Sequence, residues 1–476
     1  MSLSPSPSLP ARKPIEEEVW MFAEERAQEI LSTIQPVFVA DRSRKEIIDH
    51  VKTLLKDHFG VEQVYFFGSV PLKTYLPDGD IDLTVLTPHN KETEIASALC
   101  IMLEAKKKDP NFPVTDVLYV PAQVKVIKCR IRNISVDISF NQTAGLCALC
   151  FLEQVDQNFG KDHLFKRSII LIKAWCYYES RILGANTGLI STYALAILVL
   201  NIINISYSSL SGPLSVLLKF LEYYGSFDWD KHCVTANGPV LISSLPNITE
   251  TENHQVYLSE AFFKECMELY TVSIKATDPS RLFFPVKYLN ILDPLKHSNN
   301  LGRSVTKGNM QRIRHAFALG ARKLRDALTV PPVETMGWKV EKFFSNSLNR
   351  NGKGQRQDVE EPVFAFGTGR ANLSELRGDF EAYFKSLVSG KLFHGEIQHK
   401  WYVTGEKHGF FWKDLNLSTM MPNIQRSRGT GTYIPEMSQE SYAERFSRKP
   451  STVCASLPST STSQTQTQTQ PLKQNP

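Results

Sequence analysis

The sequence carries no strong excess of charge of either sign. Its 476 residues contain 54 Lys and Arg side chains against 49 Asp and Glu, a net charge of +5, and the first 330 residues are almost balanced, with 36 basic and 35 acidic side chains. This balance excludes a histone-like coat of positive charge, so any nucleic acid must be bound in a local groove. We therefore expect residues 1–330 alone to have weak affinity for RNA.

Cysteine is sparse and irregularly spaced. Eight cysteines in a chain of this length exclude the small disulfide-stapled class and indicate free thiols in a reducing compartment. Cys147 and Cys150 form a CxxC pair, but neither a second such pair nor a suitably spaced His pair accompanies it. Core packing is therefore favoured over a zinc site for these two residues.

Long uninterrupted apolar runs are missing as well. The longest apolar stretch, 189–205, is interrupted by Ser191, Thr192, Asn201 and Asn204, which favours a buried helix over a membrane span. The Ser/Pro-rich residues 1–14 lack the apolar segment of a signal peptide. We expect a protein without a membrane partner, located in the cytoplasm, the nucleus or both.

The remaining composition, 42% hydrophobic and 22% charged, is that of a globular protein with two or three domains. Between residues 15 and 145, helical spacing gives way to strand-like segments of period two, with a helical interlude at 92–107. These segments are VYFF, IDLTVL, TDVLYV, VKVIKC and ISVDISF. Residues 146–330 are mostly helical in pattern. The predicted fold class is α+β: a mixed sheet with helices, followed by a helical domain.

The C-terminal part has weaker patterns. In residues 331–449, the run SNSLNRNGKGQRQ (345–357) predicts a linker, a short helix is expected at 373–387, and the stretch HKWYVTGEKHGFFWK (399–413) is aromatic and basic. The aromatic side chains of this stretch either stack on RNA bases or dock on the core, and docking is the favoured interpretation. Residues 1–14 and 450–476 are expected to be disordered.

One segment, VYFFGSVPLKTYLPDGDIDLTVL (64–86), carries the chemistry. Alternate side chains of a strand share one face, so Asp80 and Asp82 are placed side by side while Ile81 and Leu83 point into the core. Two adjacent carboxylates repel each other unless a cation neutralises them, and Mg²⁺ is the hard ion that matches oxygen ligands, with Mn²⁺ as the alternative.

The segments around this pair complete a site. The strand-like ISVDISF (134–140) places Asp137 as the only acid on its polar face, where it supplies a third carboxylate. Gly68 lets the backbone approach a ligand closely, and the Ser69 hydroxyl with N–H groups at a helix start suits phosphate oxygens. The competing interpretation, a turn with solvated acids, explains one Asp better than three. The pattern predicts metal-assisted phosphoryl or nucleotidyl transfer.

These motifs resemble the DNA polymerase β-like nucleotidyltransferase superfamily. Within it, residues 15–328 look similar to the noncanonical poly(A) polymerases and terminal uridylyltransferases, especially the plant members, with a nucleotidyltransferase palm at 15–145 and a helical PAP/OAS1-type substrate-binding domain at 146–330. The resemblance implies that Asp80, Asp82 and Asp137 hold two Mg²⁺ ions, and that a nucleotide from an NTP is added to an RNA 3′ end with release of pyrophosphate.

Three later segments match positions of this family. The resemblance implies that Lys173 binds the triphosphate, although a solvated helix lysine is the alternative. It places Ser191 and Tyr193 at the nucleotide, with the Tyr ring stacked on the base, although a core Tyr also fits. It further implies that a loop with Asp293, Asn299, Asn300 and Arg303 recognises the nucleotide, and an ordinary Asn-Gly turn is the alternative there.

Departures from the family bear on which nucleotide is used. Relatives that add uridylate often carry His where this chain has Asn299, so ATP is the favoured substrate and UTP the alternative. Tyr177 replaces a second lysine of some relatives, and Ala148 and Leu149 replace an Asn-Thr pair that touches the ribose in others. A catalytically weak RNA-binding scaffold is a further hypothesis. Since no RNA-recognition motif is present, target choice is expected to involve an adaptor protein.

Overall fold

The computed structural model describes most of the chain up to residue 352, together with a few short segments beyond it. The described residues are 14–88, 91–121, 124–245, 256–270, 283–329, 335–352, 356, 358–359, 399–403 and 410–415. Residues 1–13 of the predicted disordered segment 1–14, the predicted disordered tail 450–476 and the predicted helix at 373–387 lie outside the described residues. All statements below refer to the described part of the chain.

A five-stranded mixed sheet forms the first structural layer, and its strands match the predicted segments. In the order β1-β2-β5-β4-β3, the strands are β1 (Val64–Phe67), β2 (Ile81–Val85), β5 (Ile134–Phe140), β4 (Lys125–Ile131) and β3 (Val114–Pro121). β2 and β5 run parallel, whereas the other neighbouring pairs are antiparallel. The prediction of a mixed sheet is confirmed.

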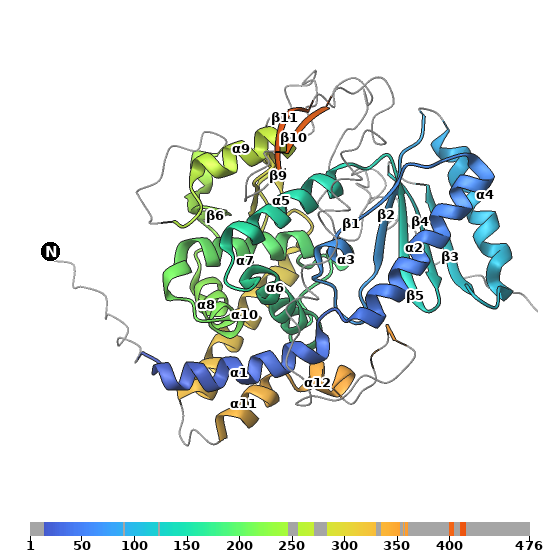
Figure 1. The fold of residues 1–476 in the computed structure, drawn as a ribbon. Coiled ribbons are helices and arrows are strands. Elements are labelled where there is room, and N and C mark those ends of the chain that lie inside the picture. Colours follow the sequence, from blue (N-terminus) through green and yellow to red (C-terminus); the bar gives the residue numbers. More distant parts are fainter. Residues whose placement is uncertain are drawn as a thin grey trace, which may run out of the picture. The chain divides into compact units, whose positions relative to one another are not determined.

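Helices α2 (Phe38–Phe59) and α4 (Glu92–Ala105) pack on one face of this sheet (Figure 1). The alternation in β2 points Ile81, Leu83 and Val85 into that interface, where they pack with Ile47 and Leu99 and are removed from water. The polar side chains of β2 and β5 therefore lie on the opposite face. The short helix α3 (Ser69–Leu72) follows β1, and the 3₁₀ turn η1 (Lys106–Lys108) follows α4.

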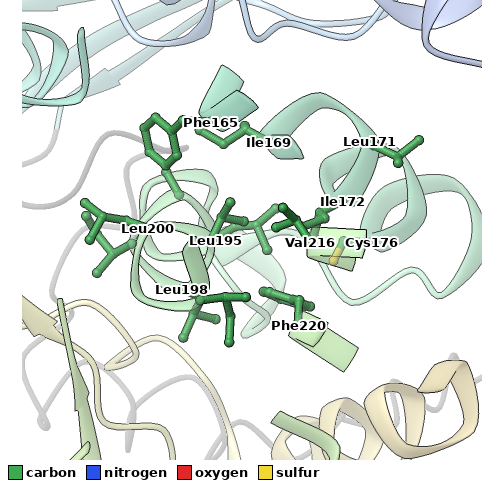
Figure 2. Packing of buried hydrophobic residues seen from close by; sticks show 14 of the residues in the cluster. Phe165, Ile169, Leu171, Ile172, Cys176, Leu195, Leu198, Leu200, Val216 and Phe220 are labelled. Carbon is green, nitrogen blue, oxygen red and sulfur yellow. The ribbon is translucent and has the colours of Figure 1, made fainter. Parts of the chain in front are cut away.

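The second domain is helical and contains the larger core. Its helices are α5 (Ala144–Phe159), α6 (Leu164–Ala174), the π-helical turn η2 (Trp175–Glu179), α7 (Thr192–Ser206), α8 (Pro213–Ser226), α9 (Glu260–Tyr270) and α10 (Lys307–Thr329), with short 3₁₀ turns at η3 (Ala185–Thr187), η4 (Tyr207–Ser209) and η5 (Ile242–Ser244). Figure 2 shows how side chains of α6, η2, α7 and α8 interdigitate in its centre. Two hairpins, β6 (His232–Thr235) with β7 (Gly238–Leu241) and β8 (Leu292–Asp293) with β9 (Lys296–Asn300), complete the domain.

Helix α7 is the described helix that comes closest to a membrane span. The segment Thr192–Ser209 is long and apolar enough by composition, but 67% of it is buried inside the protein. Its apolar side chains point in every direction because neighbouring helices surround it, which is the pattern of a core helix. The prediction of a buried helix for 189–205 is thus confirmed.

Helix α1 (Glu17–Ile34) departs from the predicted division of the chain. Sequence analysis assigned it to the first domain, but its apolar face, with Ala27, Ile30 and Leu31, is buried in the core of the helical domain. Figure 1 places it beside α11 and α12, which contact it. Helical periodicity reveals that a face is buried but not which partner covers it, so the sequence could not assign this helix to a domain.

The predicted linker at 345–357 is wrong in its first half. Helix α12 (Ser345–Asn351) occupies it, directly after α11 (Met336–Phe343), and Ser347 and Asn351 are buried. The carboxylate of Glu179 accepts hydrogen bonds from the backbone N–H groups of Asn346 and Ser347, which satisfies the first turn of α12. This tertiary cap lets a polar, Asn-rich segment remain helical.

Beyond residue 360, the described chain forms one hairpin of β10 (His399–Val403) and β11 (Phe410–Leu415). These strands contain the backbone of residues 399–403 and 410–413 of the aromatic, basic stretch singled out above. The proposed RNA stacking or core docking of those aromatic side chains stays a prediction.

The burial of α1 in the helical domain can be tested by unfolding. Replacing the fully buried Ile30 by Ala should lower the free energy of unfolding by about 3 kcal/mol, because the lost contacts leave a cavity. Met21→Ala on the exposed side of the same helix is the matched control and should have little effect, since Met21 is 64% exposed. Urea denaturation measures both, and equal effects of the two variants would contradict the assignment.

Candidate active site

Two parallel strands bring three carboxylates together. Asp82 of β2 lies directly opposite Asp137 of β5, and Asp80 immediately precedes β2 on the same face. One carboxylate oxygen from each of Asp80, Asp82 and Asp137 lies within 4.8 Å of the others. Because the register is fixed by buried neighbours such as Ile81 and Val136, this convergence is built into the sheet.

Gly68 makes room for this cluster at the end of β1. Its φ angle is +75°, a conformation that residues with a side chain rarely adopt, and a Cβ atom here would lie 2.5 Å from Oδ2 of Asp82. The glycine predicted to allow close approach of a ligand therefore allows close approach of Asp82. Ser69 follows as the first residue of α3.

The electrostatics of the cluster call for a cation. Burial raises the pKa of Asp82 well above its usual value, and the charges of Asp80 and Asp137 raise it further. Burial also raises the pKa of Asp137, while the Lys128 ammonium acts in the opposite direction. Three convergent carboxylate oxygens are the donors that hard divalent cations prefer, so the residues present fit Mg²⁺ or Mn²⁺.

Lys128 is a member of the site that sequence analysis missed. It lies on β4 opposite Asp137, and its ammonium forms an ion pair with that carboxylate. The alternation of VKVIKC places Lys128 on one face with Arg130, so a polar face was visible in the sequence. The pairing of β4 with β5 was not visible, because a single sequence does not specify which strands are neighbours.

Lys173 joins the carboxylates across the boundary between the domains. A cavity there is lined by Gly68, Ser69, Asp80 and Asp82 from the sheet domain and by Lys173 and Tyr193 from the helical domain. The Lys173 ammonium is buried and donates a long hydrogen bond, 3.4 Å, to the carbonyl of Thr74. Burial lowers its pKa, and the nearby Asp80, Asp78 and Asp82 counteract this. A solvated helix lysine does not fit these observations.

Of the predicted Ser-Tyr pair, only Tyr193 faces the cavity. The hydroxyl of Ser191 caps α7 by accepting a hydrogen bond from the N–H of Ala194. Tyr193 lines the cavity, and its hydroxyl donates to Oδ1 of Asp293 at 3.2 Å. Ser191 therefore stabilises the start of α7. Stacking of Tyr193 on a base stays a prediction.

The residues of the predicted recognition loop play two different parts: some bond one another through their side chains, and Asn300 bonds the backbone of the loop. Oδ2 of Asp293 accepts from the amide of Asn299 at 2.7 Å, and Arg303 donates to the Asn299 side-chain oxygen. Asn300 is fully buried, and its amide bonds the backbone of Ile291, Gly302, Leu289 and Pro285. Asn300 therefore shapes the loop, while Asp293, Asn299 and Arg303 form a polar chain that ends at Tyr193.

Two of the family departures can also be placed. Leu149, one of the two residues that replace the Asn-Thr pair, lines the cavity, and its apolar side chain offers no hydrogen bond to a ribose. Tyr177, which replaces a second lysine, is 44% exposed on η2.

The loop that carries Asp80 is braced from three directions, which the sequence did not reveal. Asp78 accepts a hydrogen bond from the Tyr178 hydroxyl at 2.8 Å and pairs with Arg350 of α12 at 3.3 Å. The buried Arg44 of α2 donates to the carbonyl of Gly79 at 2.9 Å and to the carboxylate of Asp358 at 3.0 Å. Residues from the predicted linker region therefore help to hold the active-site loop.

Comparisons with known proteins agree with this geometry. The central palm domain described as "Poly(A) RNA polymerase, mitochondrial-like" matches residues 24–154, and the PAP/OAS1 substrate-binding domain matches residues 159–348. The chain is similar to the poly(A) RNA polymerase cid14 of Schizosaccharomyces pombe, with 25% identity over 44% of this chain and 31% of that protein. It is also similar to Protein HESO1 of Arabidopsis thaliana, with 22% identity over 64% of each chain.

A solved structure of Cid1, described as an RNA terminal uridylyl transferase, covers 68% of this chain and 98% of its own, with 19% identity and a TM-score of 0.48. The matches span less than two thirds of the curated relatives cid14 and HESO1.

The two consecutive domain matches and the carboxylate cluster place this chain in the polymerase β-like nucleotidyltransferase superfamily. More narrowly, the combination of this palm with a PAP/OAS1 domain makes the chain a member of the noncanonical poly(A) polymerase and terminal nucleotidyltransferase group.

The role of Gly68 can be separated from ordinary backbone strain. Gly68→Ala should weaken Mn²⁺ binding about tenfold or more, because the added Cβ displaces Asp82. Gly160→Ala is the matched control, since Gly160 also has a positive φ, +60°, but no atom lies within 4 Å of the added Cβ. Electron paramagnetic resonance of free Mn²⁺ measures the affinity, and equal affinities of the two variants would refute the proposed contact.

The repulsion within the cluster predicts a pH-dependent cost. Folding raises the pKa of Asp82, so the cation-free protein should lose stability as the pH rises from about 4, the usual carboxyl value, through the raised value. Asp82→Asn should then stabilise the protein in EDTA at pH 7.5 by about 1 kcal/mol and give no gain near pH 3.5.

Asp57→Asn, which alters an exposed acid on α2, is the control and should change little at either pH. Chemical denaturation at the two pH values measures the effect. A loss of stability from Asp82→Asn in EDTA at pH 7.5 would count against repulsion as the dominant force.

Proposed function

We propose that the protein is a template-independent nucleotidyltransferase that adds AMP from ATP to the 3′ end of RNA. The observation that carries the proposal is the meeting of Asp80, Asp82 and Asp137 beside a cavity that also contains Ser69 and Lys173. This reaction requires carboxylates that hold a divalent cation and a positive charge that binds the phosphates of the nucleotide. The three aspartates meet the first requirement, and the buried lysine meets the second. The names of cid14 and of Poly(A) RNA polymerase protein 1 of Saccharomyces cerevisiae support this class of activity.

In the proposed reaction, the 3′ oxygen of the RNA attacks the α-phosphorus of the nucleotide. A bond forms between these two atoms, the bond from the α-phosphorus to the oxygen of the leaving pyrophosphate breaks, and the hydroxyl proton passes to solvent. Asp80, Asp82 and Asp137 would hold the divalent cation, whose chemistry is to make the hydroxyl more acidic and to offset the charge of the triphosphate. The braced loop at 77–80 keeps Asp80 in position.

Lys173 binds the triphosphate in this proposal. Its ammonium is buried near the carboxylates and, within the described residues, makes only a long hydrogen bond to Thr74, so a phosphate oxygen would be a better partner. Ser69 lines the same cavity and offers a hydroxyl to the phosphates. Both groups are held by rigid elements, which lowers the entropic cost of orienting the substrate.

The base is recognised by the polar chain from Tyr193 to Arg303. Asn299 holds the centre of this chain through Asp293 and Arg303, where relatives that add uridylate often carry His. His297, the nearest histidine, is exposed on β9 and does not replace it. These features favour ATP, and terminal uridylyl transfer is the second candidate because the overall architecture serves both reactions. An RNA-binding adaptor would choose the RNA targets.

An NTP-selectivity assay tests the proposal. The purified protein with Mg²⁺ and a labelled RNA oligonucleotide should extend the 3′ end with ATP in preference to UTP, CTP and GTP. Asp137→Ala should lower the rate about 1000-fold, because the cation that stabilises the transition state loses a ligand. Asp57→Ala, which alters an exposed acid of α2 outside the carboxylate cluster, should leave the rate unchanged.

Asn299→His should shift the preference towards UTP if the polar chain sets selectivity. If the unmodified protein incorporates UTP in preference to ATP, the proposed activity is uridylyl transfer and not adenylyl transfer. Tight RNA binding with no incorporation of any NTP under Mg²⁺ or Mn²⁺ would show instead that the fold serves as a scaffold.

A further inference from the structure

A large groove lies on the helical domain, lined by residues other than those of the active-site cavity. It has a volume of about 870 Å³ and runs between α10 on one side and α11 with α12 on the other. We call it the α10–α11 groove and define it by Trp175, Arg312, Lys323, Trp338, Lys342 and Phe343. Its inner part is aromatic, since Trp175 stacks on Phe343 with ring centroids 6.2 Å apart and planes within 7°.

The walls of the α10–α11 groove are positively charged. Helix α10 carries six Lys and Arg side chains but one acid, Asp326. In residues 1–330 as a whole, by contrast, the numbers of basic and acidic side chains are nearly equal. Arg312 and Lys323 line the groove from α10, and Lys339 and Lys342 line it from α11. The groove is thus a local concentration of positive charge.

The acidic residues of the groove reduce this charge only in part. Glu179 and Asp326 are the acids in its lining, and the Glu179 carboxylate is occupied by the N–H groups at the start of α12. Four cations against these two acids leave a positive surface. This arrangement suits a polyanion more than a neutral ligand.

Trp338 adds a flat apolar surface at the edge of the groove. Its side chain is 60% exposed, although the buried face of α11 is already provided by Met336 and Val340. The ammonium of Lys342 lies 4.8 Å from the centre of the Trp338 ring. An exposed ring beside a cation can stack on a base while the cation meets the adjoining phosphate.

The groove is connected to the active site through one turn of helix. Helix α6, which carries Lys173, continues directly into η2, and Trp175 and Glu179 of η2 line the groove. Tyr178 of the same turn holds Asp78 in the loop of Asp80. Arg350, which pairs with Asp78, belongs to α12 beside the groove.

We propose that the α10–α11 groove binds single-stranded RNA, namely a part of the substrate strand that precedes the 3′ end entering the active site. That the bound strand is the substrate rests on the proposed function. That the groove binds RNA at all rests on its positive charge and on the exposed ring of Trp338. A structured duplex would need a wider contact surface, and a small apolar ligand would not require four cations. An acidic protein segment is the occupant that the test has to separate from RNA.

The experiment measures the binding of a fluorescent 15-nucleotide oligoadenylate to the full chain by anisotropy, without NTP, at two salt concentrations. Lys323→Glu and Lys342→Glu should each weaken binding about tenfold at 0.1 M salt and reduce its salt dependence. Trp338→Ala should weaken binding about fivefold or more, through the loss of base stacking. All three side chains are on the surface of helices, and circular dichroism checks that the variants fold.

Two matched controls lie elsewhere on the surface. Lys219→Glu makes the same change of charge at an exposed position of α8. Phe38→Ala removes another exposed aromatic ring, 68% accessible, which has the cation of Arg42 at 6.0 Å. Both should bind RNA like the unmodified protein.

The outcomes separate this inference from the proposed function. If groove variants bind and extend RNA as the unmodified protein does, the groove is not an RNA site, although nucleotidyl transfer stands. If the groove variants lose RNA affinity while the unmodified protein incorporates no NTP, the groove is an RNA site and the proposed function fails. Unchanged RNA affinity with loss of binding to an acidic peptide would overturn the proposal in favour of a protein partner.

Discussion

The repulsion among Asp80, Asp82 and Asp137 is the constraint on which the active site depends. Parallel pairing of β2 with β5 places Asp82 opposite Asp137, and the buried residues between them fix that register. The convergence of three carboxylates is electrostatically unfavourable, and the positive charges of Lys128 and the buried Lys173 reduce this repulsion. Without a cation, the repulsion among these carboxylates lowers the stability of the folded protein. Such a loss of stability at the functional site is typical of catalytic centres.

Holding such a cluster together requires support from distant parts of the chain. Gly68 removes the atoms that would push Asp82 away, and Arg44, Tyr178 and Arg350 hold the loop before Asp80. These supports come from α2, η2 and α12, so both domains contribute to the position of one carboxylate. The helical domain therefore carries Lys173 and also helps to fix the loop that precedes Asp80.

Much of this architecture was predictable from sequence, because strand alternation and helical periodicity are strong local signals. The five strands and the three aspartates were found in this way, and the resemblance to the family singled out Lys173. The packing of α1 on the helical domain, the helix at 345–351 and the scaffold role of Asn300 were not, since each depends on contacts between residues far apart in the chain. Lys128 was missed for the same reason: its partner strand is set by the fold.

Anomalous scattering from a crystal soaked in Mn²⁺ with a nonhydrolysable ATP analogue tests the central claim most directly. The account predicts a peak among the carboxylates of Asp80, Asp82 and Asp137, at about 2.0 to 2.6 Å from their oxygens. It also predicts that the analogue's triphosphate lies between that peak and the ammonium of Lys173. A bound analogue with no peak among the three ordered carboxylates would contradict the claim that their repulsion is offset by a divalent cation.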